Sequence, residues 1–186
     1  MGKKMRKNIG AHNFLEPMPV LIIATYNPDG SANAMNAAWG MISDFSEVSI
    51  SMSEHQTTDN LAQRKAFTVS LGTEDTVTAC DYVGIVSGRK EKDKFAKSEF
   101  TAIKSEYVDA PLIEQLPLTL ECKVKSFDDG ILVGEIVNVS VDEKIYTDGK
   151  IDMKKLKPIC YDPINGGYYS IGERVADAFS EGKKLK

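Results

Sequence analysis

Residues 19–40 read PVLIIATYNPDGSANAMNAAWG, and this stretch predicts a β-hairpin. The apolar run from Pro19 to Tyr26 is typical of a buried strand, and Asn27-Pro28-Asp29-Gly30 is a turn with proline at its second position. The returning strand, Ser31 to Trp39, carries asparagines, small alanines and the only tryptophan where branched apolar residues are usual. Such a strand leaves its backbone accessible to a flat molecule.

Further strands are predicted downstream of this hairpin. Val48 to Met52 alternates between apolar and polar residues, and Phe67 to Leu71 is another apolar run. Leu118 to Phe127 and Ile131 to Val141 flank the turn Asp128-Asp129-Gly130 and form a second predicted hairpin. The pattern therefore predicts an all-β core with interspersed helices.

Helices are predicted between and after the strands. The last of them opens with Ser170-Ile171-Gly172-Glu173, an S-x-x-E capping box that fixes its predicted start. The segment from Lys144 to Gly167 has few apolar residues and two turn signals, and it is interpreted as a long excursion from the core. The predicted helices are Thr57–Arg64, around Thr76–Tyr82, Lys90–Lys97, Asp152–Leu156 and Ile171–Ser180.

Composition indicates a globular protein. The 186 residues are 42% hydrophobic and 27% charged, and we predict a single domain over residues 1–186 with its core at residues 16–180. No apolar run approaches the roughly 20 residues that span a bilayer, and no apolar segment follows the basic start MGKKMRKN as it would in a signal peptide. The net charge of −4 lacks the basic excess that nucleic-acid binding needs. We therefore expect neither a membrane nor a nucleic-acid partner.

The residue types that usually carry catalysis or metals are sparse. Cys80, Cys122 and Cys160 form no CxxC pair, so we expect reduced thiols and a cytoplasmic protein. Only His12 and His55 are present, too few for a histidine-based metal cage, and we predict no metal site, although carboxylates leave that question open. The sequence contains no G-x-G-x-x-G, G-x-x-x-x-G-K-[ST], G-x-S-x-G or H-E-x-x-H pattern. With no nucleophile indicated, the reactive group of an enzyme is expected to come from a bound cofactor.

Longer stretches of the chain carry a family resemblance. In order, they are PVLIIATYNPDGSANAMNAAWG, TTDNLAQRKAFTVSL, DYVGIVSGRKEKDKFAKSEFT, YVDAPLIEQLPLTLECKV and GGYYSIGERVADAF. Together they cover most of the chain from Pro19 to Phe179. They resemble the flavin reductase-like, FMN-binding split-barrel family, and its flavoredoxin-like branch most closely. The resemblance implies a mainly β fold with helices, the FMN-binding split β-barrel.

In that family the strand after the first turn runs along the isoalloxazine ring of FMN. The small side chains of this strand fit such a role. The family often has a hydroxyl residue where this chain has Asn36 and Ala38, which leaves open which side chain meets the ring edge. The alternative is a plain hairpin strand with alanines beneath a helix and Trp39 in the core. The positions that the resemblance places at the ring are Asn33, Met35, Asn36, Ala37, Ala38 and Trp39.

The family holds the FMN phosphate at a helix start with the pattern T-x-x-N. Thr57 and Asn60 match this pattern, and a helix N-terminus offers unsatisfied N–H groups and a positive dipole end. An ordinary threonine N-cap explains the same residues. Basic residues just upstream are frequent in the family, whereas this chain has Ser53-Glu54-His55. Positive charge for the phosphate is therefore expected from another segment.

The segment from Ser87 to Lys97 supplies that charge. Five basic and two acidic residues give it a net charge of +3 in a chain that is acidic overall. Its match to the family pattern S-G-R-x-x-x-D-K-F implies Ser87 and Lys94 as phosphate contacts, with Lys92 as a further candidate. A solvated helix face of alternating charges is the other interpretation.

An aromatic residue covers the flavin, or lines its entrance, in the family. Tyr168 and Tyr169 stand between Gly166-Gly167 and the predicted C-terminal helix. Adjacent strand residues face opposite ways, so only one of the two can reach the flavin, and we predict Tyr168. Core packing is the alternative for this tyrosine. His55 is a candidate for the pocket wall or an exposed loop residue.

The function that the resemblance implies is an FMN-binding oxidoreductase with no catalytic side chain of its own. Electrons would pass from NADH or NADPH through FMN to a free flavin, another small molecule or a partner protein. A second hypothesis is a flavoredoxin-type electron carrier without a nicotinamide site, and a third is a cofactor-free barrel that serves only interactions. The family builds its flavin pocket at a two-fold interface, so a homodimer is implied as well.

Overall fold

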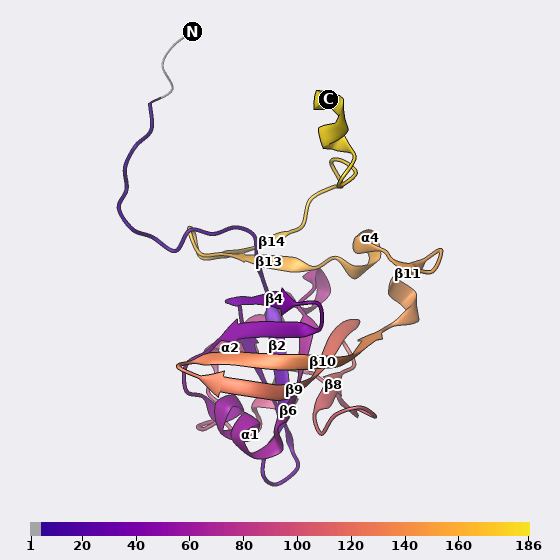
Figure 1. The fold of residues 1–186 in the computed structure, drawn as a ribbon. Coiled ribbons are helices and arrows are strands. Elements are labelled where there is room, and N and C mark those ends of the chain that lie inside the picture. The colour runs from indigo at the N-terminus through magenta and orange to yellow at the C-terminus, as the bar shows by residue number, and fades with distance from the viewer. Residues whose placement is uncertain (1–4) are drawn as a thin grey trace.

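The chain folds around a seven-stranded antiparallel sheet (Figure 1), and the computed structural model describes residues 5–186. The hairpins predicted on either side of residues 27–30 and 128–130 are both confirmed. The mainly β fold is confirmed as well. Across the sheet the strands are β3 (Ala32–Ala37), β2 (Leu21–Tyr26), β6 (Ala66–Leu71), β9 (Leu118–Asp128), β10 (Ile131–Val141), β5 (Glu47–Ser51) and β4 (Gly40–Asp44).

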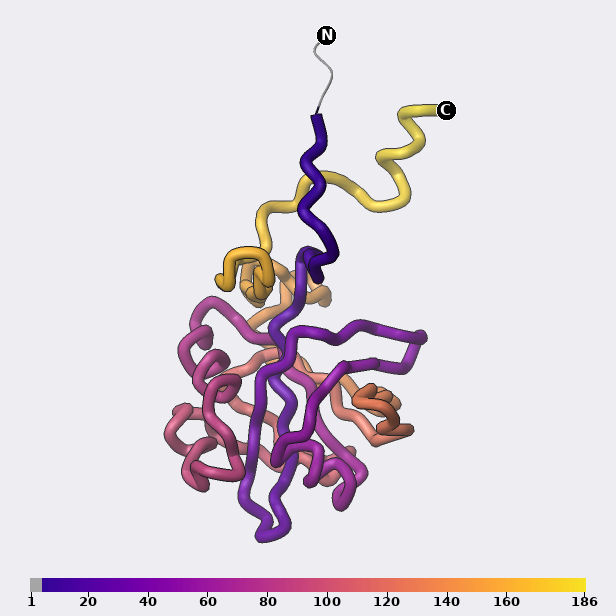
Figure 2. The backbone as a smooth tube through the Cα atoms, turned by 90° about the vertical axis from the view of Figure 1, so that its left-hand side faces the viewer, coloured from indigo at the N-terminus to yellow at the C-terminus, as the bar shows by residue number. Residues whose placement is uncertain are grey.

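The sheet curls into a half-barrel because its two edge strands follow each other in the sequence. Only Ala38 and Trp39 separate β3 at one edge from β4 at the other. At this corner, the backbone N–H of Ser51 donates to Trp39 O (2.8 Å) and ties the turn to β5. Figure 2 shows the β4–β5 hairpin turning away from the long β2–β3 hairpin there. The corner, and β4 itself, were not predicted from the sequence.

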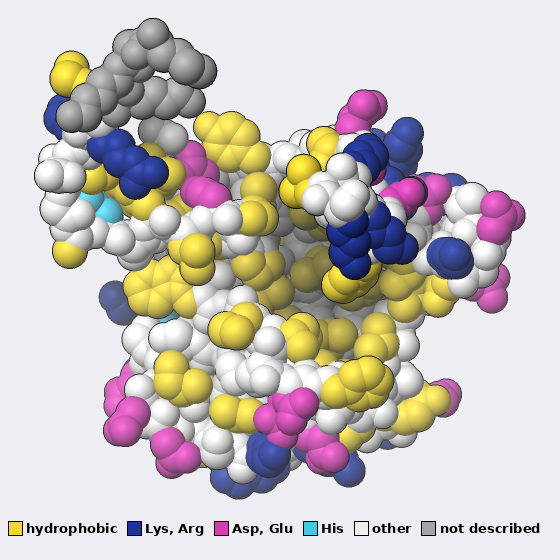
Figure 3. All heavy atoms as spheres, turned by 45° about the horizontal axis from the view of Figure 1, so that its top comes forward, with side chains coloured by type: hydrophobic (Ala, Val, Ile, Leu, Met, Phe, Trp, Pro, Cys, Tyr) yellow, Lys and Arg dark blue, Asp and Glu magenta, His cyan; other side chains and the backbone are white. Residues whose placement is uncertain are grey.

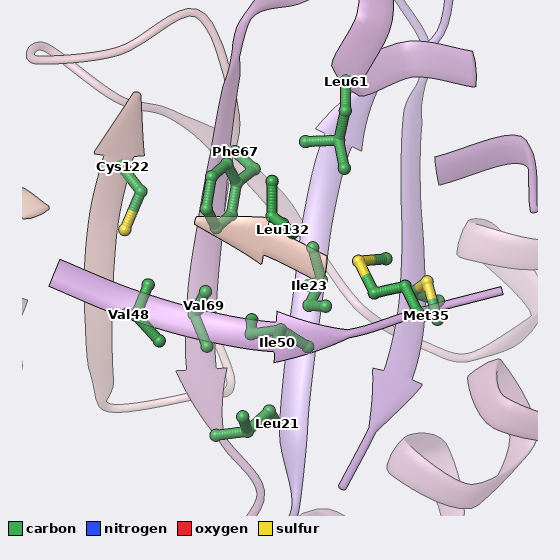
Figure 4. Packing of buried hydrophobic residues seen from close by; sticks show 11 residues of the cluster. Leu21, Ile23, Met35, Val48, Ile50, Leu61, Phe67, Val69, Cys122 and Leu132 are labelled. Atoms are coloured by element: carbon green, nitrogen blue, oxygen red, sulfur yellow. The ribbon is translucent and has the colours of Figure 1, made fainter. Parts of the chain in front are cut away.

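The inside of the half-barrel holds the main hydrophobic core (Figure 4). Phe67 on β6 is fully buried, and its ring lies so close to Gly134 on β10 that a Cβ on this glycine would collide with the ring. A glycine inside a strand often marks such a close approach. The buried members of this core are Leu21, Ile23, Met35, Val48, Ile50, Met52, Leu61, Phe67, Val69, Cys122 and Leu132.

A second core covers the other face of β2 and β3. Helix α2 (Val77–Ile85) packs there through Cys80 and Val83, against Ile22 and Ala34. This helix was predicted around residues 76–82 and is confirmed, with three more residues at its end. The short strands β7 (Ala102–Lys104) and β8 (Pro111–Ile113) pair with each other beside it.

Two further helices lie next to β3. α1 (Gln56–Arg64) begins one residue before its predicted start, and His55, not a threonine, is the N-cap. The backbone N–H of His55 donates to Thr58 Oγ1 (3.0 Å), so Thr57 lies inside the first turn. α3 covers only Lys94–Lys97, and the helix predicted from Lys90 is wrong in its first half. There the backbone N–H groups of residues 90 and 91 both donate to Ser87 O, which closes tight turns instead.

The excursion predicted over residues 144–167 contains several short elements. They include β11 (Tyr146–Thr147), β12 (Lys150–Ile151) and the predicted helix α4 (Met153–Leu156), which Asp152 caps. After them, β13 (Ile159–Asp162) pairs with β1 (Met18–Pro19) and with β14 (Gly167–Ser170) in a separate three-stranded sheet. Single 3₁₀ turns lie at Glu74–Thr76, Glu143–Ile145 and Glu181–Leu185.

The helix predicted over Ile171–Ser180 does not form. Ser170 ends β14 as the pairing partner of Ile159, and residues 171–177 follow without regular structure. A capping box is a local signal, whereas a short helix gains most of its stability from burying an apolar face. Val175 and Phe179 are fully exposed, so a helix here would have no surface of its own chain to pack against.

Both terminal segments leave the body on the same side (Figures 1 and 2). The N-terminal one leads into β1, and the C-terminal one follows β14. None of the helices in residues 5–186 is both long and apolar enough to cross a membrane.

Candidate cofactor site

Two predicted contacts meet at one hydrogen bond between β3 and α1. Asn33 Nδ2 donates to Thr57 Oγ1 at 2.9 Å, and both side chains are buried. Because the Thr57 hydroxyl accepts this bond, its own proton remains to be donated to another acceptor. The first turn of α1 also carries backbone N–H groups that the helix itself does not satisfy.

The turn that contains Ser87 packs directly onto this pair. A Cβ on Gly88 would lie 2.6 Å from Asn33 Oδ1 and 3.3 Å from Gln56 Cβ, so only glycine fits. Arg89 fastens the turn through two hydrogen bonds from Nη2 to the carboxylate of Asp59 on α1 (2.9 and 3.0 Å). Ser87 is exposed at the start of this turn. The predicted contacts from three separate stretches are therefore held together.

Lys94 is the buried cation of the site. Its side chain is 5% exposed on α3, which packs against β3. Burial lowers the pKa of its ammonium group from 10.5 to about 8, and no acidic side chain among residues 5–186 offsets that effect. A buried charge without a counter-charge is unfavourable, and an anion next to it would remove the penalty.

The other basic residues of the segment from Ser87 to Lys97 are placed differently. Arg89 is paired with Asp59, and Lys97 with Glu91 (2.6 Å). Lys92 is exposed, and its charge helps to lower the pKa of Asp29 in the β2–β3 turn. The net charge of +3 that the sequence suggested is thus partly neutralised within the protein, and Lys94 remains as the buried positive group.

Strand β3 offers its backbone at the edge of the sheet. Edge strands carry N–H and C=O groups that no neighbouring strand pairs. The side chain of Met35 lies in the core and Ala37 packs against that core, so neither side chain extends past the free edge. Asn36 is held on the opposite face, where its Nδ2 donates to Cys80 O of α2 at 3.1 Å.

The end of this edge is aromatic. Ala38 is half-buried at the corner, and Trp39 beside it is 55% exposed. The indole helps to line a pocket of about 350 Å³ formed with the N-terminal segment, including His12 and Phe14. The alternative that Trp39 is a core residue is therefore wrong, and its ring is accessible to a flat ligand.

Both the nitrogen and the oxygen of the Asn60 side-chain amide form hydrogen bonds within the protein. Its Nδ2 donates to Thr25 Oγ1 and to Asn27 Oδ1 (2.9 Å each), and its Oδ1 accepts from Gln56 Nε2 (3.0 Å). These bonds fasten α1 to the β2–β3 turn. The side chain is occupied by protein partners, and a direct contact of Asn60 with a cofactor stays a prediction.

The two adjacent tyrosines of β14 face opposite ways, as expected. Tyr168 is half-buried and its hydroxyl donates to Asp81 Oδ1 on α2 at 2.8 Å, whereas Tyr169 is exposed. Burial and the neighbouring Asp81 carboxylate raise the pKa of Tyr168. Tyr168 therefore lies against α2, the same helix whose Cys80 carbonyl accepts the hydrogen bond from Asn36. Its hydroxyl is hydrogen-bonded to Asp81, and its ring is partly accessible.

Sequence reasoning missed three residues that shape this site. Gly88 permits the close approach of the turn, Gln56 packs against it, and Asp81 orients Tyr168. Gly88 stands inside the quoted pattern S-G-R, so its presence was a usable signal. No local sequence signal pointed to Asp81, because Tyr168, to which it is hydrogen-bonded, is 87 residues away in the chain.

Known proteins resemble this chain in sequence and in fold. A family model described as the flavin reductase like domain matches residues 14–164. The chain belongs to this family. The matched residues include every predicted cofactor contact except Tyr168, and the prediction of the family and of the split-barrel fold is confirmed.

Solved structures of flavoredoxins superimpose closely on this family member. Flavoredoxin of Desulfovibrio vulgaris (Miyazaki F) is 36% identical, with a TM-score of 0.91 over 96% of this chain and 100% of that one. Flavoredoxin from Methanosarcina acetivorans is 27% identical, with a TM-score of 0.87 over 97% and 100% of the two chains. An FMN-binding domain of a flavin reductases-like enzyme from Shewanella baltica OS155 shares the fold at 18% identity, with a TM-score of 0.77 over 86% and 88%.

Proposed function

We propose that this protein binds FMN and passes electrons from NADH or NADPH through it to an acceptor. The observation that carries the proposal is Lys94, a buried lysine whose pKa is lowered by desolvation, with no acidic side chain among residues 5–186 to offset that effect. The phosphate of FMN is a dianion that would supply the missing charge. The similarity to flavoredoxins supports a flavin as the molecule that carries this phosphate.

The phosphate would be held where β3, α1 and the Gly88 turn meet. The Thr57 hydroxyl, which accepts from Asn33, would donate its own proton to the phosphate from the first turn of α1, where backbone N–H groups and the helix dipole favour an anion. Ser87 adds an exposed hydroxyl at the start of the Gly88 turn, and Lys94 adds the positive charge. Lys92 contributes at longer range as an exposed charge.

The ring would lie along the free edge of β3. Backbone groups at the half-buried end of this edge strand, residues 36–38, are suited to the polar edge of the isoalloxazine, and small alanine side chains let a planar ring approach. Trp39 offers an exposed aromatic face at the end of the strand. Bound FMN would accept a hydride and release electrons. The protein itself offers no reactive side chain for this chemistry.

The site is open on one side, and we propose that a second copy of the chain closes it. A two-fold dimer is the commonest assembly of soluble proteins. The end of β3 is half-buried over residues 36–38 and Trp39 beside it is exposed, so a partner at this end would shield a bound ring from water.

The first prediction concerns the identity of the cofactor. The purified protein is expected to be yellow, and heat or acid is expected to release FMN and not FAD, because the proposed contacts fit one terminal phosphate dianion. The absorbance spectrum and chromatography of the released flavin measure this. A colourless protein that takes up no FMN at micromolar concentration would refute the proposed function.

The second prediction separates a reductase from a carrier. In a reductase, the nicotinamide ring has to come within reacting distance of flavin N5, so the exposed flavin face must admit a second flat ring. NADH or NADPH is then expected to bleach the flavin absorbance within seconds without oxygen. Tyr168→Ala is expected to change this rate far more than it changes FMN affinity.

The similarity to flavoredoxins favours the carrier as the second candidate function. A carrier without a nicotinamide site would keep its colour for many minutes with either nucleotide and lose it with dithionite or a reduced partner protein. That result would refute the reductase while leaving FMN binding intact. Tyr169→Ala serves as the matched control, because the side chain of Tyr169 is exposed and faces away from Tyr168.

A further inference from the structure

The C-terminal segment exposes large apolar side chains that nothing in its own chain covers. We call residues 171–186 the C-terminal arm. Val175 is 98%, Phe179 100% and Leu185 93% exposed. The arm has no strand and no α-helix, and it runs away from the body (Figure 1). Burying a side chain of this kind stabilises a protein by about 1.5 to 3 kcal/mol, so an arm of this composition is suited to contact another surface.

The total surface of the chain is too large for a compact monomer. The chain exposes 12149 Å², whereas a compact monomer of 20.5 kDa exposes about 8,900 Å². The excess of about 3,000 Å² exceeds the roughly 1,000 to 2,500 Å² that each partner buries in a permanent homodimer. Nearly every residue of the two terminal segments is exposed, so these segments contribute to the excess surface. This surface is available for an interface with another chain.

A cavity at the base of the arm is left unfilled by the chain itself. It measures about 990 Å³. On one side it is lined by the start of the arm, with Ile171 and Val175, and on the other by the excursion, with Ile151 and Met153. Figure 3 shows a hollow with apolar side chains gathered in and around it on this face. The cavity is open to solvent and charged side chains line it together with the apolar ones, so an apolar segment of another chain seated there would bury surface that water now reaches.

The occupant that these observations favour is a second copy of the chain. An exchange of arms between two copies is self-complementary, because each copy gives one arm and receives one. Each copy also exposes further apolar side chains on β4 and β10, namely Met41, Ile42, Val137 and Val139. An arm that crosses to the partner would cover apolar surface on both chains.

We propose that the C-terminal arm of each copy packs on the other copy and fastens the dimer. This inference rests on the dimer of the proposed function and adds the segment that holds it together. Val175 and Phe179 are the apolar anchors of the arm. The test is the dimer dissociation constant of the full-length protein, measured by sedimentation equilibrium with its flavin bound.

Three proteins are compared in this experiment. The unmodified protein is expected to be a dimer at micromolar concentration, and V175D/F179D is expected to raise the dissociation constant by about 100-fold or more, as loss of two buried anchors does. Ile103→Asp is the matched control, because Ile103 is 44% exposed on β7, whose partner strand β8 lies in the body of the molecule, whereas the arm runs away from it (Figure 1); the dissociation constant of this variant is expected to stay unchanged. All three substitutions alter exposed side chains, and circular dichroism verifies that both variants retain the fold.

The outcomes separate the arm from the dimer. If the unmodified protein is a monomer, the dimer and the arm exchange are both refuted, while retained flavin leaves FMN binding standing. If V175D/F179D dimerises as tightly as the unmodified protein, the arm exchange is refuted and the dimer stands. Amide hydrogen exchange gives an independent check, because residues 175–185 are expected to be protected in the dimer and to lose that protection on dilution below the dissociation constant.

Discussion

Lys94→Ala is expected to weaken FMN binding by about 10- to 100-fold and to leave riboflavin binding nearly unchanged, because a charge-assisted bond to the phosphate is worth about 1.5 to 3 kcal/mol. Riboflavin has the same ring and lacks the phosphate, so it isolates that contact. Thr57→Ala is expected to act in the same direction with a smaller effect, since it removes one neutral donor. Quenching of flavin fluorescence during titration measures both affinities. Equal weakening of FMN and riboflavin would show that these residues only support the fold.

The pH dependence of FMN binding provides a sharper form of the same test. Burial lowers the pKa of Lys94 to about 8, and only the protonated ammonium group attracts the phosphate. The phosphate is fully ionised above about pH 7, because its second pKa is about 6. FMN affinity is therefore expected to be highest near pH 7 and to fall progressively as the pH rises through about 8.

Lys94→Arg is the matched control for this profile. A guanidinium group stays charged throughout this range, so FMN affinity of the variant is expected to be independent of pH between 7 and 9. Riboflavin affinity of the unmodified protein is expected to be flat over the same range. A fall in FMN affinity that persists in Lys94→Arg would assign the pH dependence to another group.

Phe67→Ala is expected to lower the free energy of unfolding by about 3 to 5 kcal/mol, the usual cost of removing a buried phenylalanine ring. Phe67 is fully buried on β6 in the centre of the sheet, where it faces Cys122 of β9. Urea unfolding followed by circular dichroism measures the loss. A cost below about 1 kcal/mol would show that this core is not packed as described.

Gly134 gives that experiment an internal control. A Cβ at Gly134 would collide with the Phe67 ring, so Gly134→Ala is expected to cost about 1 to 3 kcal/mol in the unmodified protein. In the Phe67→Ala background the ring is gone, and the added methyl group is expected to be tolerated. Additive effects of the two substitutions would contradict the direct contact between them.

The sequence by itself determined the local elements whose signals lie within a few residues. Asn27-Pro28-Asp29-Gly30 and Asp128-Asp129-Gly130 set the two hairpins, because turn residues and alternation of apolar side chains act between neighbours. The resemblance carried by the ordered motifs also located Asn33, Thr57 and Lys94, and the structure brings their elements together around β3. Whether these residues touch FMN stays a prediction.

Only the tertiary structure decided which of these local signals were realised. The capping box at Ser170 began no helix, since Val175 and Phe179 have no surface in their own chain on which a helix would bury them. The segment from Ser87 to Lys97 carries a net positive charge in the sequence, yet Asp59 on α1 neutralises Arg89 while Lys94 is left buried.

The physical reason is the distance along the chain between the groups involved. Burial, and with it the lowered pKa of Lys94, depends on atoms from β3 and α3 that the fold alone brings together. The same holds for the bond between Tyr168 and Asp81, which are 87 residues apart. Local sequence sets the conformation that each segment prefers, whereas packing between distant segments sets which side chains lose water and which charges remain without a partner.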